Sequence, residues 1–346
     1  MPTATVESST GKTSFNYTIS TPSASSATSI DNSLPTLLFI HAVYCGQQFF
    51  QPLAIGIDNR AIGQFEDPQI RRFNCVALDL RLHGRTTTDG IPEGYNAKDA
   101  AEDLALFMDE VRLPACHIVG LSMGTMVGIA LAVYYPNKAL SLFLVSPLGL
   151  EELPDASSGR REIVDLWIEG NKTGRPDMAA ISDSIFGAHQ LGFNNNLNSL
   201  VRALEGIVLP LALKNMVPAK CEQYERCMFD FLNNRKEYSK DELSRICVPV
   251  KLVHCLEDIA YPLDYSERFM CQLKEAGVTV SLATIPEAPH FGVLTHGDIV
   301  NWMLHDFIVD SCGTSIPPAP GEIHSPWEED LVKAGWNKGG DDPEDD

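Results

Sequence analysis

A serine lies midway between two glycines in the segment Gly120-Leu121-Ser122-Met123-Gly124. An apolar run of strand length, residues 116–121, leads into this segment, and an apolar helical pattern follows it. Glycines on both sides of a serine let a strand turn sharply into a helix, which lifts the hydroxyl out of the sheet and points the helix N-terminus at it. The pattern therefore predicts that Ser122 is a nucleophile. An ordinary glycine-flanked turn is the alternative interpretation.

A serine nucleophile needs a base, and the base needs a carboxylate that orients it. His290 follows the strand pattern of residues 278–285, and Asp258 follows that of residues 248–256. In open α/β folds, ligands bind at the carboxyl ends of the strands. Taken singly, these two residues are a loop histidine and a turn former. Their joint placement predicts a Ser122, Asp258, His290 triad in which the histidine transfers protons.

The elements that must position these side chains alternate between strands and helices. Continuous apolar runs are typical of strands buried on both faces of a parallel sheet, and amphipathic helical patterns separate them. The sequence therefore predicts an α/β fold with a mostly parallel central sheet flanked by helices. The expected strands are residues 14–20 (an edge strand), 36–41, 74–80, 116–121, 140–146, 248–256 and 278–285, and the expected helices include 97–111, 123–135, 265–274 and 298–309.

The strand pattern is interrupted in the middle of the chain, where residues 147–245 have the pattern of several amphipathic helices. We interpret this block as a helical cap inserted into a core made of residues 1–146 and 246–311. Residues 312–346 are Pro-rich and then acidic, so they cannot bury enough apolar surface to offset ordering, and we expect a flexible tail. The alternative is a short helix docked on the body through Trp327, Leu331, Val332 and Trp336.

With these motifs in this order, residues 14–310 resemble the α/β-hydrolase fold superfamily. The segment His41-Ala42-Val43-Tyr44-Cys45-Gly46 matches the family's oxyanion segment, with Ala42 where glycine is usual. The stretch Asp79–Arg85 (DLRLHGR) resembles the family's Asp-x-Arg-x-His-Gly-x-Ser motif. Thr125 stands where a second glycine commonly follows the elbow.

The resemblance also separates the candidate carboxylates. Asp258 is followed four residues later by Pro262, which matches the family's acid position. That spacing favours Asp258 over the neighbouring rivals Glu257 and Asp264. His290 followed by an aromatic residue matches the family's base position.

Roles follow from the resemblance as expectations. The backbone N–H groups of Met123 and of Ala42 or Val43 would form the oxyanion hole, and His41 and His83 would be structural hydrogen-bonding residues. The implied enzyme is a capped serine hydrolase that cleaves a small, fairly apolar ester or lactone through an acyl-enzyme, with no metal and no organic cofactor. The alternatives are C–C bond hydrolysis, acyl transfer or cofactor-free perhydrolysis with the same triad, and a ligand-binding, receptor-like protein with slow turnover.

The amino-acid composition limits which binding partners are expected. Twenty-six Lys and Arg against 46 Asp and Glu give a net charge of −20. Such a surface repels phosphate backbones and anionic lipids, so we expect a small-molecule substrate and neither nucleic acid nor a membrane as partner. Nine scattered cysteines without a CxxC pair, and the lack of a secretory signal pattern, predict a cytoplasmic protein. The sequence does not predict an oligomeric state.

Overall fold

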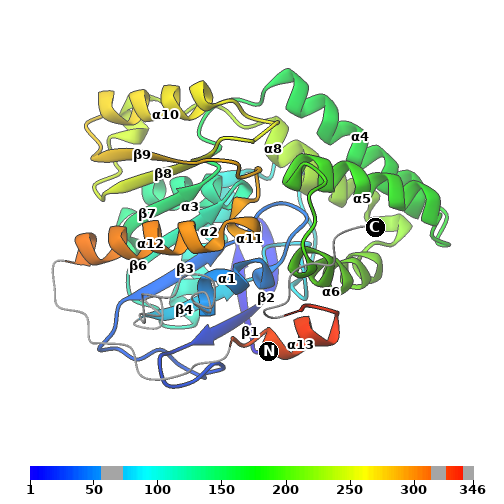
Figure 1. Cartoon of the computed structure of the whole chain (residues 1–346), viewed down its shortest axis with the longest axis horizontal. Helices are drawn as coiled ribbons and strands as arrows, with labels where there is room; N and C mark the ends of the chain where they lie inside the picture. The colour runs from blue at the N-terminus through cyan, green and yellow to red at the C-terminus, as the bar shows by residue number, and fades with distance from the viewer. Residues whose placement is uncertain (56–72, 313–324, 338–346) are drawn as a thin grey trace.

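A computed structural model describes residues 1–55, 73–312 and 325–337 of the chain. In these residues the strands form one sheet in the order β1-β2-β4-β3-β6-β7-β8-β9, with β5 paired to β2 (Figure 1). Pairing is antiparallel where β2 is involved and parallel from β4 to β9. The expected fold class, α/β with a mostly parallel sheet, is confirmed. The strands are β1 (Thr3–Ser8), β2 (Gly11–Ser20), β3 (Thr36–Ile40), β4 (Asn74–Leu78), β5 (Thr87–Thr88), β6 (Cys116–Leu121), β7 (Ala139–Val145), β8 (Val250–Cys255) and β9 (Val280–Ile285).

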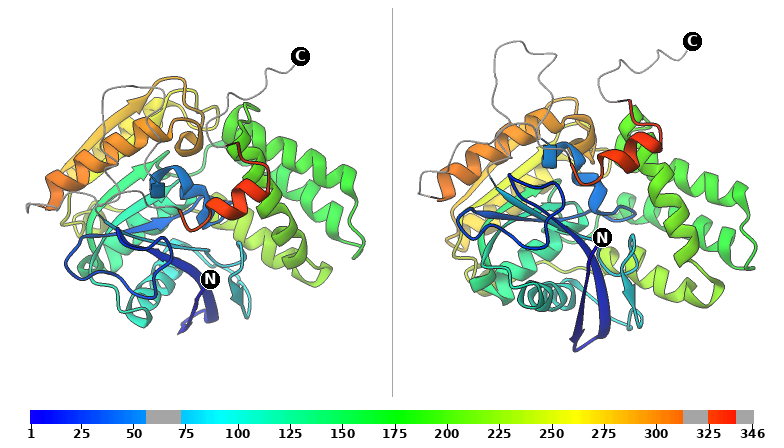
Figure 2. Two further views of the ribbon diagram at one scale, coloured as in Figure 1. Left: turned by 60° about the horizontal axis from the view of Figure 1, so that its bottom comes forward. Right: turned by 90° about the horizontal axis from the view of Figure 1, so that it is seen from below.

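The helices of the described residues lie on both faces of the sheet and in one block beside it (Figures 1 and 2). They are α1 (Gln51–Ile55), α2 (Ala97–Glu110), α3 (Met123–Tyr134), α4 (Pro154–Asn171), α5 (Met178–Phe193), α6 (Ser199–Asn215), α7 (Cys221–Glu225), α8 (Phe231–Asn233), α9 (Lys240–Leu243), α10 (Leu263–Glu275), α11 (Gly292–Thr295), α12 (Gly297–Cys312) and α13 (Glu328–Lys333). None of these described helices has both the length and the apolar composition that crossing a bilayer requires.

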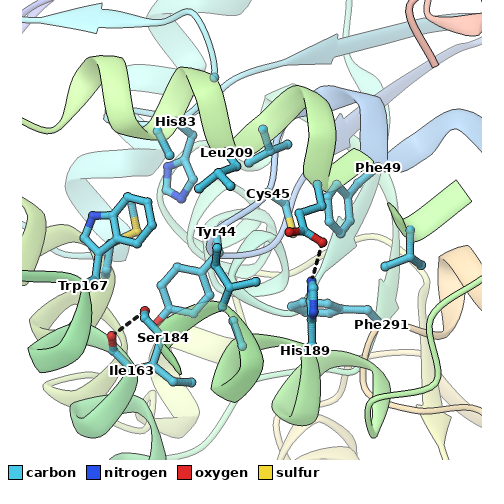
Figure 3. A pocket seen from close by; sticks show the side chains of 18 of the residues that line it. Tyr44, Cys45, Phe49, His83, Ile163, Trp167, Ser184, His189, Leu209 and Phe291 are labelled. Carbon is cyan, nitrogen blue, oxygen red and sulfur yellow. Dashed lines mark hydrogen bonds and ion pairs between the residues drawn. The ribbon is translucent and has the colours of Figure 1, made fainter. Parts of the chain in front are cut away.

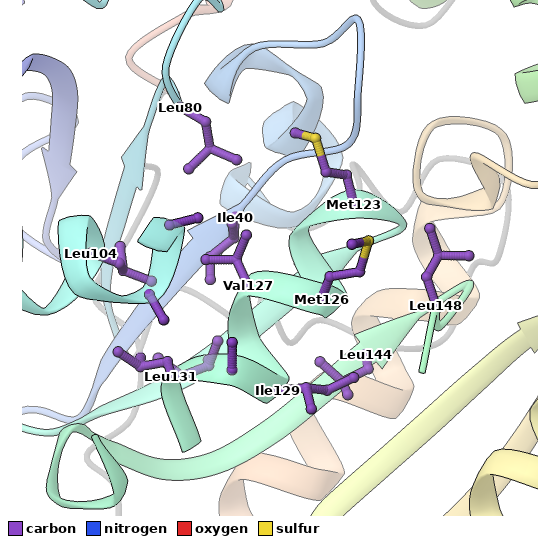
Figure 4. Close-up of a cluster of buried hydrophobic side chains, with 14 of the residues drawn as sticks. Ile40, Leu80, Leu104, Met123, Met126, Val127, Ile129, Leu131, Leu144 and Leu148 are labelled. Carbon is purple, nitrogen blue, oxygen red and sulfur yellow. The ribbon is translucent and has the colours of Figure 1, made fainter. Parts of the chain in front are cut away.

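Alternate residues of the central strands serve two hydrophobic cores, one on each face of the sheet. In β3, Leu38 and Ile40 face the core built with α2 and α3, whereas Leu37 and Phe39 face the core built with α1 and α12. Figure 4 shows the first core, where side chains of α3 pack between Leu104 of α2 and strand residues such as Ile40 and Leu144. Burial on both faces explains why these strands have continuous apolar sequences.

The N-terminal strand was not predicted from the sequence. Residues 14–20, expected as an edge strand, belong to β2, which pairs with β1 on one side and with β4 on the other. The edge is therefore β1, where only Ala4 and Val6 are buried. Two small apolar side chains among Thr, Glu and Ser give a weak alternating pattern, which is why it was missed.

Helices α4 to α9 occupy the chain between β7 and β8, within the block that we interpreted as a cap. Figures 1 and 2 show α4, α5 and α6 together to one side of the sheet. α4 and α5 pack against each other, and their shared interior includes Trp167 and Ile181. The block is thus helical throughout and contains a small core of its own.

The acidic tail differs from the expectation of a flexible segment over residues 325–337. Helix α13 contacts α6 there (Figure 2), and Trp327 and Leu331 are 3% and 0% exposed. The Ser325 hydroxyl also donates to the Gln51 side chain of α1. These apolar contacts outweigh the ordering cost that the acidic composition suggested. The rest of the predicted tail, residues 313–324 and 338–346, lies outside the described residues.

Five histidines of the described residues are buried, and burial lowers the pKa of three of them, His41, His83 and His117, strongly. His117 hydrogen-bonds Ser141 across neighbouring strands, at 2.8 Å. His41 Nε2 accepts the Leu80 backbone N–H at 2.9 Å, and its ring lies 4.8 Å from that of His83. Burial lowers the pKa of His41 and His117 to about 4, and that of His83 to about 3, so all three are neutral at pH 7.

We predict that Trp327→Ala destabilises the protein by about 3–5 kcal/mol, the usual cost of removing a buried aromatic ring. Val332 lies on the same helix but is 49% exposed, so Val332→Ala is the matched control and should change stability by about 0.5 kcal/mol or less. Urea unfolding of the three proteins measures the difference. Equal midpoints for both variants would show that α13 contributes nothing to stability.

We also predict that stability falls as the pH is lowered from about 6.5 towards 4. In that window the unfolded state binds protons on the three histidines and the folded state does not, so unfolding is favoured as pH decreases. Each lowered pKa contributes about 2 kcal/mol between pH 8 and pH 5. Because Asn can still donate to the Arg81 carbonyl that His83 Nδ1 contacts, His83→Asn is the test variant. Urea unfolding at pH 8 and at pH 5 should show a smaller decrease in the free energy of unfolding for this variant than for the wild type. An identical decrease would contradict the lowered pKa of His83.

Candidate active site

Ser122 lies in the sharp turn between β6 and α3, with φ 51° and ψ −112°. Such a conformation is strained for a non-glycine residue and persists only where its surroundings enforce it. Gly124 shows how: a Cβ there would lie 1.9 Å from the Ile40 carbonyl oxygen at the end of β3. At Gly120, a Cβ would lie 2.8 Å from the Gly124 carbonyl oxygen. Both glycines are therefore required for the helix to begin directly against the sheet.

The three residues predicted as a triad lie in one hydrogen-bonded chain. The Ser122 hydroxyl donates to His290 Nε2 at 2.8 Å, and His290 Nδ1 donates to Asp258 Oδ2 at 2.5 Å. Ser122 and His290 are each 1% exposed, and the Asp258 carboxylate is equally buried. This geometry allows a proton to pass from the serine to the imidazole while the carboxylate fixes the ring.

Asp258 is held by the turn that follows β8. Its second oxygen, Oδ1, accepts the backbone N–H groups of Ala260 and Tyr261 at 2.9 and 3.0 Å. Both rivals, Glu257 and Asp264, have exposed side chains and are not brought to the histidine. One carboxylate oxygen of Asp258 thus contacts His290, and the other stabilises the turn through its backbone N–H groups.

His290 lies in the loop after β9 and is fixed by contacts that sequence reasoning missed. The Ser146 hydroxyl donates to the His290 carbonyl oxygen at 2.6 Å. The Phe291 backbone N–H donates to the Gly192 carbonyl oxygen of α5 at 2.8 Å. Ser146 ends β7 with φ 51°, a conformation that nothing in the sequence around it signals.

The expected oxyanion residues lie next to the elbow. Met123 is the first residue of α3, so its N–H has no acceptor within the helix. Gly124 lies against the carbonyl oxygens of Ile40 and His41, so α3 begins next to the loop of Ala42 and Val43, both of which are buried. The Ala42 carbonyl accepts His41 Nδ1 at 2.7 Å and the Cys45 N–H at 3.3 Å, which fixes the peptide between Ala42 and Val43.

Thr125 has a structural role that the sequence did not reveal. Its hydroxyl donates to the Ser122 carbonyl at 2.6 Å and accepts the Leu148 N–H at 2.9 Å. The hydroxyl therefore joins the elbow to the loop that leads into α4. A glycine at this position could make neither bond.

A cavity of about 130 Å³ lies between the loop of Tyr44 and the helices α4 to α6 (Figure 3). Phe291, the residue after the base, is one of its walls. Its lining is mainly apolar, and its polar groups include the His189–Glu205 pair, 3.6 Å apart, the Ser184 hydroxyl, which donates to the Ile163 carbonyl, and the Tyr44 hydroxyl. Its lining includes Tyr44, Phe49, His83, Trp167, Phe193, Leu209 and Phe291.

Residues 35–210 match the family model of the alpha/beta hydrolase fold. Among curated proteins, the chain is 42% identical over 83 residues to the dihydrolipoyllysine-residue acetyltransferase component of the acetoin cleaving system of Cupriavidus necator. That match covers 24% of this chain and only 22% of the relative's length.

Solved structures resemble nearly the whole chain. A thermophilic esterase from Thermogutta terrifontis, solved with malate bound, superposes with a TM-score of 0.63 over 90% of this chain and 98% of its own, at 17% identity. The enol-lactonase of Burkholderia xenovorans superposes with a TM-score of 0.60 over 86% of this chain and 97% of its own, also at 17% identity. At such identities the likeness shows the fold. Together with the family match over half of the chain, it shows that this protein is a member of the α/β hydrolase fold family.

Proposed function

We propose that this protein is a serine hydrolase that cleaves a small ester or lactone through an acyl-enzyme. The observation that carries the proposal is the buried chain from Ser122 Oγ through His290 to Asp258, with links of 2.8 and 2.5 Å. A serine, a base and an orienting carboxylate in hydrogen-bond contact are the arrangement that activates a hydroxyl as a nucleophile.

The reaction would proceed in two halves. Ser122 Oγ attacks the carbonyl carbon as its proton moves to His290 Nε2, giving a tetrahedral oxyanion. The oxyanion collapses, the bond to the alcohol oxygen breaks, and the imidazolium gives its proton to that leaving oxygen. Water then attacks the acyl-enzyme with His290 as base, and the acid is released as Ser122 regains its proton. These steps need no metal and no organic cofactor.

Two backbone donors would stabilise the oxyanion. Met123 supplies the first N–H, at the positive end of α3. Val43 is favoured over Ala42 as the second, because the Ala42 carbonyl is bound by His41 and Cys45, and in a trans peptide the Val43 N–H points the opposite way. Removing one oxyanion donor typically costs about 3 kcal/mol of transition-state stabilisation.

The cavity supports a small, fairly apolar substrate body. Its volume of about 130 Å³ is similar to that of an engineered apolar cavity of about 150 Å³ that binds benzene. We propose that the helical block of residues 147–245 acts as the cap over this site. The block contributes Trp167, Phe193 and Leu209 to the lining, and the contact between Gly192 and Phe291 joins it to the loop of the base.

A cytoplasmic location is part of the proposal. All nine cysteines are free in the structure, and five of them are buried: Cys45, Cys75, Cys116, Cys227 and Cys255. Free, buried thiols suit a reducing compartment.

Acyl transfer is the second candidate, since the relative from Cupriavidus necator is named as an acetyltransferase component. The first half-reaction is the same, and an alcohol or thiol replaces water in the second. C–C bond hydrolysis, cofactor-free perhydrolysis and a receptor-like protein with slow turnover use the same residues. A product assay with and without an added alcohol separates transfer from hydrolysis.

We predict that Ser122→Ala abolishes labelling by a fluorophosphonate probe and lowers ester turnover at least a thousandfold, the scale of triad knockouts. Far-UV circular dichroism should be unchanged because alanine removes only the hydroxyl. A panel of p-nitrophenyl esters and lactones of increasing acyl length measures turnover. A variant that hydrolyses the panel near the wild-type rate would exclude a serine mechanism.

The role of Asp258 as the orienting carboxylate can be tested with a matched pair of variants at the adjacent residues Asp258 and Glu257. Asp258→Asn should lower kcat by roughly ten-thousandfold, because the amide favours the wrong imidazole tautomer. Glu257→Gln makes the same chemical change on an exposed side chain and should cost little. Steady-state kinetics on one ester suffices, and a larger loss for Glu257→Gln would show that the carboxylate is wrongly assigned.

A further inference from the structure

A buried arginine of the cap block has donors without partners. Arg160 lies on α4 with its side chain 1% exposed. Its Nη2 donates to the Tyr261 hydroxyl at 3.1 Å, but Nε and Nη1 have no hydrogen-bond partner within the described residues. A buried guanidinium with unpaired N–H groups is costly, so its retention calls for an explanation.

The ion pairs around Arg160 leave an excess of positive charge. Its carboxylate partner, Glu152, lies 3.6 Å from Nη2 but is bound more closely by Arg235, at 2.8 and 3.2 Å. Although burial raises the pKa of Glu152, the two arginines hold it below its ordinary value, so the group is ionised. Two guanidinium groups therefore share one carboxylate, which gives this buried cluster a charge of +1.

Two tyrosines connect Arg160 to the reaction site. Tyr261, which contacts Nη2, places its ring 5.4 Å from the imidazole of His290. Tyr44 follows the proposed oxyanion loop, and its side chain lines the cavity (Figure 3). The Tyr44 hydroxyl is buried beside the Arg160 guanidinium and has no hydrogen-bond partner of normal geometry in the described residues.

We propose that Arg160 and the Tyr44 hydroxyl bind a carboxylate of the substrate, so that the enzyme acts on esters or lactones that carry a free acid group. The inference rests on the proposed function and refines it. The apolar body of the substrate would occupy the cavity, and its carboxylate would reach Arg160 past Tyr44, the lining residue whose hydroxyl lies against the guanidinium. Charge-assisted hydrogen bonds from arginine to carboxylate are among the stronger polar contacts in proteins.

A purely structural role for Arg160 does not explain why its Nε and Nη1 groups have no partner in the described residues. Glu152 also contacts Arg235 and the Tyr261 hydroxyl, so Arg160 is not its only partner. An unbranched apolar side chain could fill the same space on α4 without leaving donors unpaired. Pairing of Glu152 therefore does not by itself explain the guanidinium, whereas binding of an anionic substrate would.

The test compares esters that differ only at the end of the acyl chain. Three pairs serve: the p-nitrophenyl hydrogen succinate, glutarate and adipate against the p-nitrophenyl butyrate, valerate and hexanoate. Each pair exchanges a terminal methyl for a carboxylate at equal length. The measured quantity is the ratio of kcat/KM within a pair, above the uncatalysed rate. We expect a ratio of about ten or more in at least one pair, the scale of a charged hydrogen bond.

Arg160→Met should reduce that ratio about 10- to 100-fold, mainly through KM, while neutral esters keep their turnover. Arg161→Met is the matched control, because Arg161 is the next residue on α4 but pairs with Asp165 and Glu225 away from the cluster. Its ratio should equal that of the wild type. An Arg160→Met enzyme that loses both substrate types equally would overturn the proposal and leave Arg160 as an anchor of α4.

The wild-type ratio decides the matter even where Arg160→Met does not fold. Turnover of neutral esters, with ratios below one in all three pairs, overturns the carboxylate site and leaves the serine hydrolase intact. Failure of the proposed function looks different: no ester of either kind is cleaved and the fluorophosphonate probe does not label Ser122.

Discussion

The close approach of Gly124 to the end of β3 is the contact on which the rest of the site depends. With the Ile40 carbonyl oxygen 1.9 Å from where a Cβ would be, no other residue fits there. The contact starts α3 directly at the sheet and forces Ser122 to φ 51°. It also brings the first N–H of α3 beside the loop of Ala42 and Val43. The absence of a side chain at Gly124 thus helps to position both the proposed nucleophile and the proposed oxyanion donors.

The remaining groups are positioned relative to this elbow by hydrogen bonds from neighbouring strands. Ser146 at the end of β7 holds the backbone of His290, and the turn after β8 holds Asp258 by two backbone N–H groups. Thr125 connects the elbow to Leu148, just ahead of the helical block. Because these contacts lie at or just after the carboxyl ends of parallel strands, the order of the strands brings together residues more than a hundred positions apart.

Much of this arrangement could be predicted from the sequence, for identifiable reasons. The glycines around Ser122 have a local signature, and the central strands β3, β4 and β6 are continuous apolar runs because both of their faces are buried. Asp258 and His290 could be placed because each follows a strand pattern, although β9, the strand ahead of His290, is only partly buried. The carboxyl ends of these strands lie at one edge of the sheet, so the residues that follow them could be expected to lie close together.

Other features carry no local signature. Ser146 and Thr125 act through contacts between elements distant in sequence, so neither could be recognised before the fold was known. The docked helix α13 has an acidic composition, and only its contact with α6 explains its order. The unpaired donors of Arg160 depend on Arg235, which binds the shared carboxylate of Glu152 more closely. That arrangement is a property of the packed helical block and is not visible in either sequence segment.

The most direct test of the account is to trap the proposed acyl-enzyme on the wild-type protein. Rapid mixing with a p-nitrophenyl ester, acid quench within the first turnover and peptide mass spectrometry would locate the acyl group. The account predicts a burst of p-nitrophenol and an acyl mass on the peptide that contains Ser122. An acyl group on another residue, or turnover through a burst-free route with no adduct at any quench time, would contradict it.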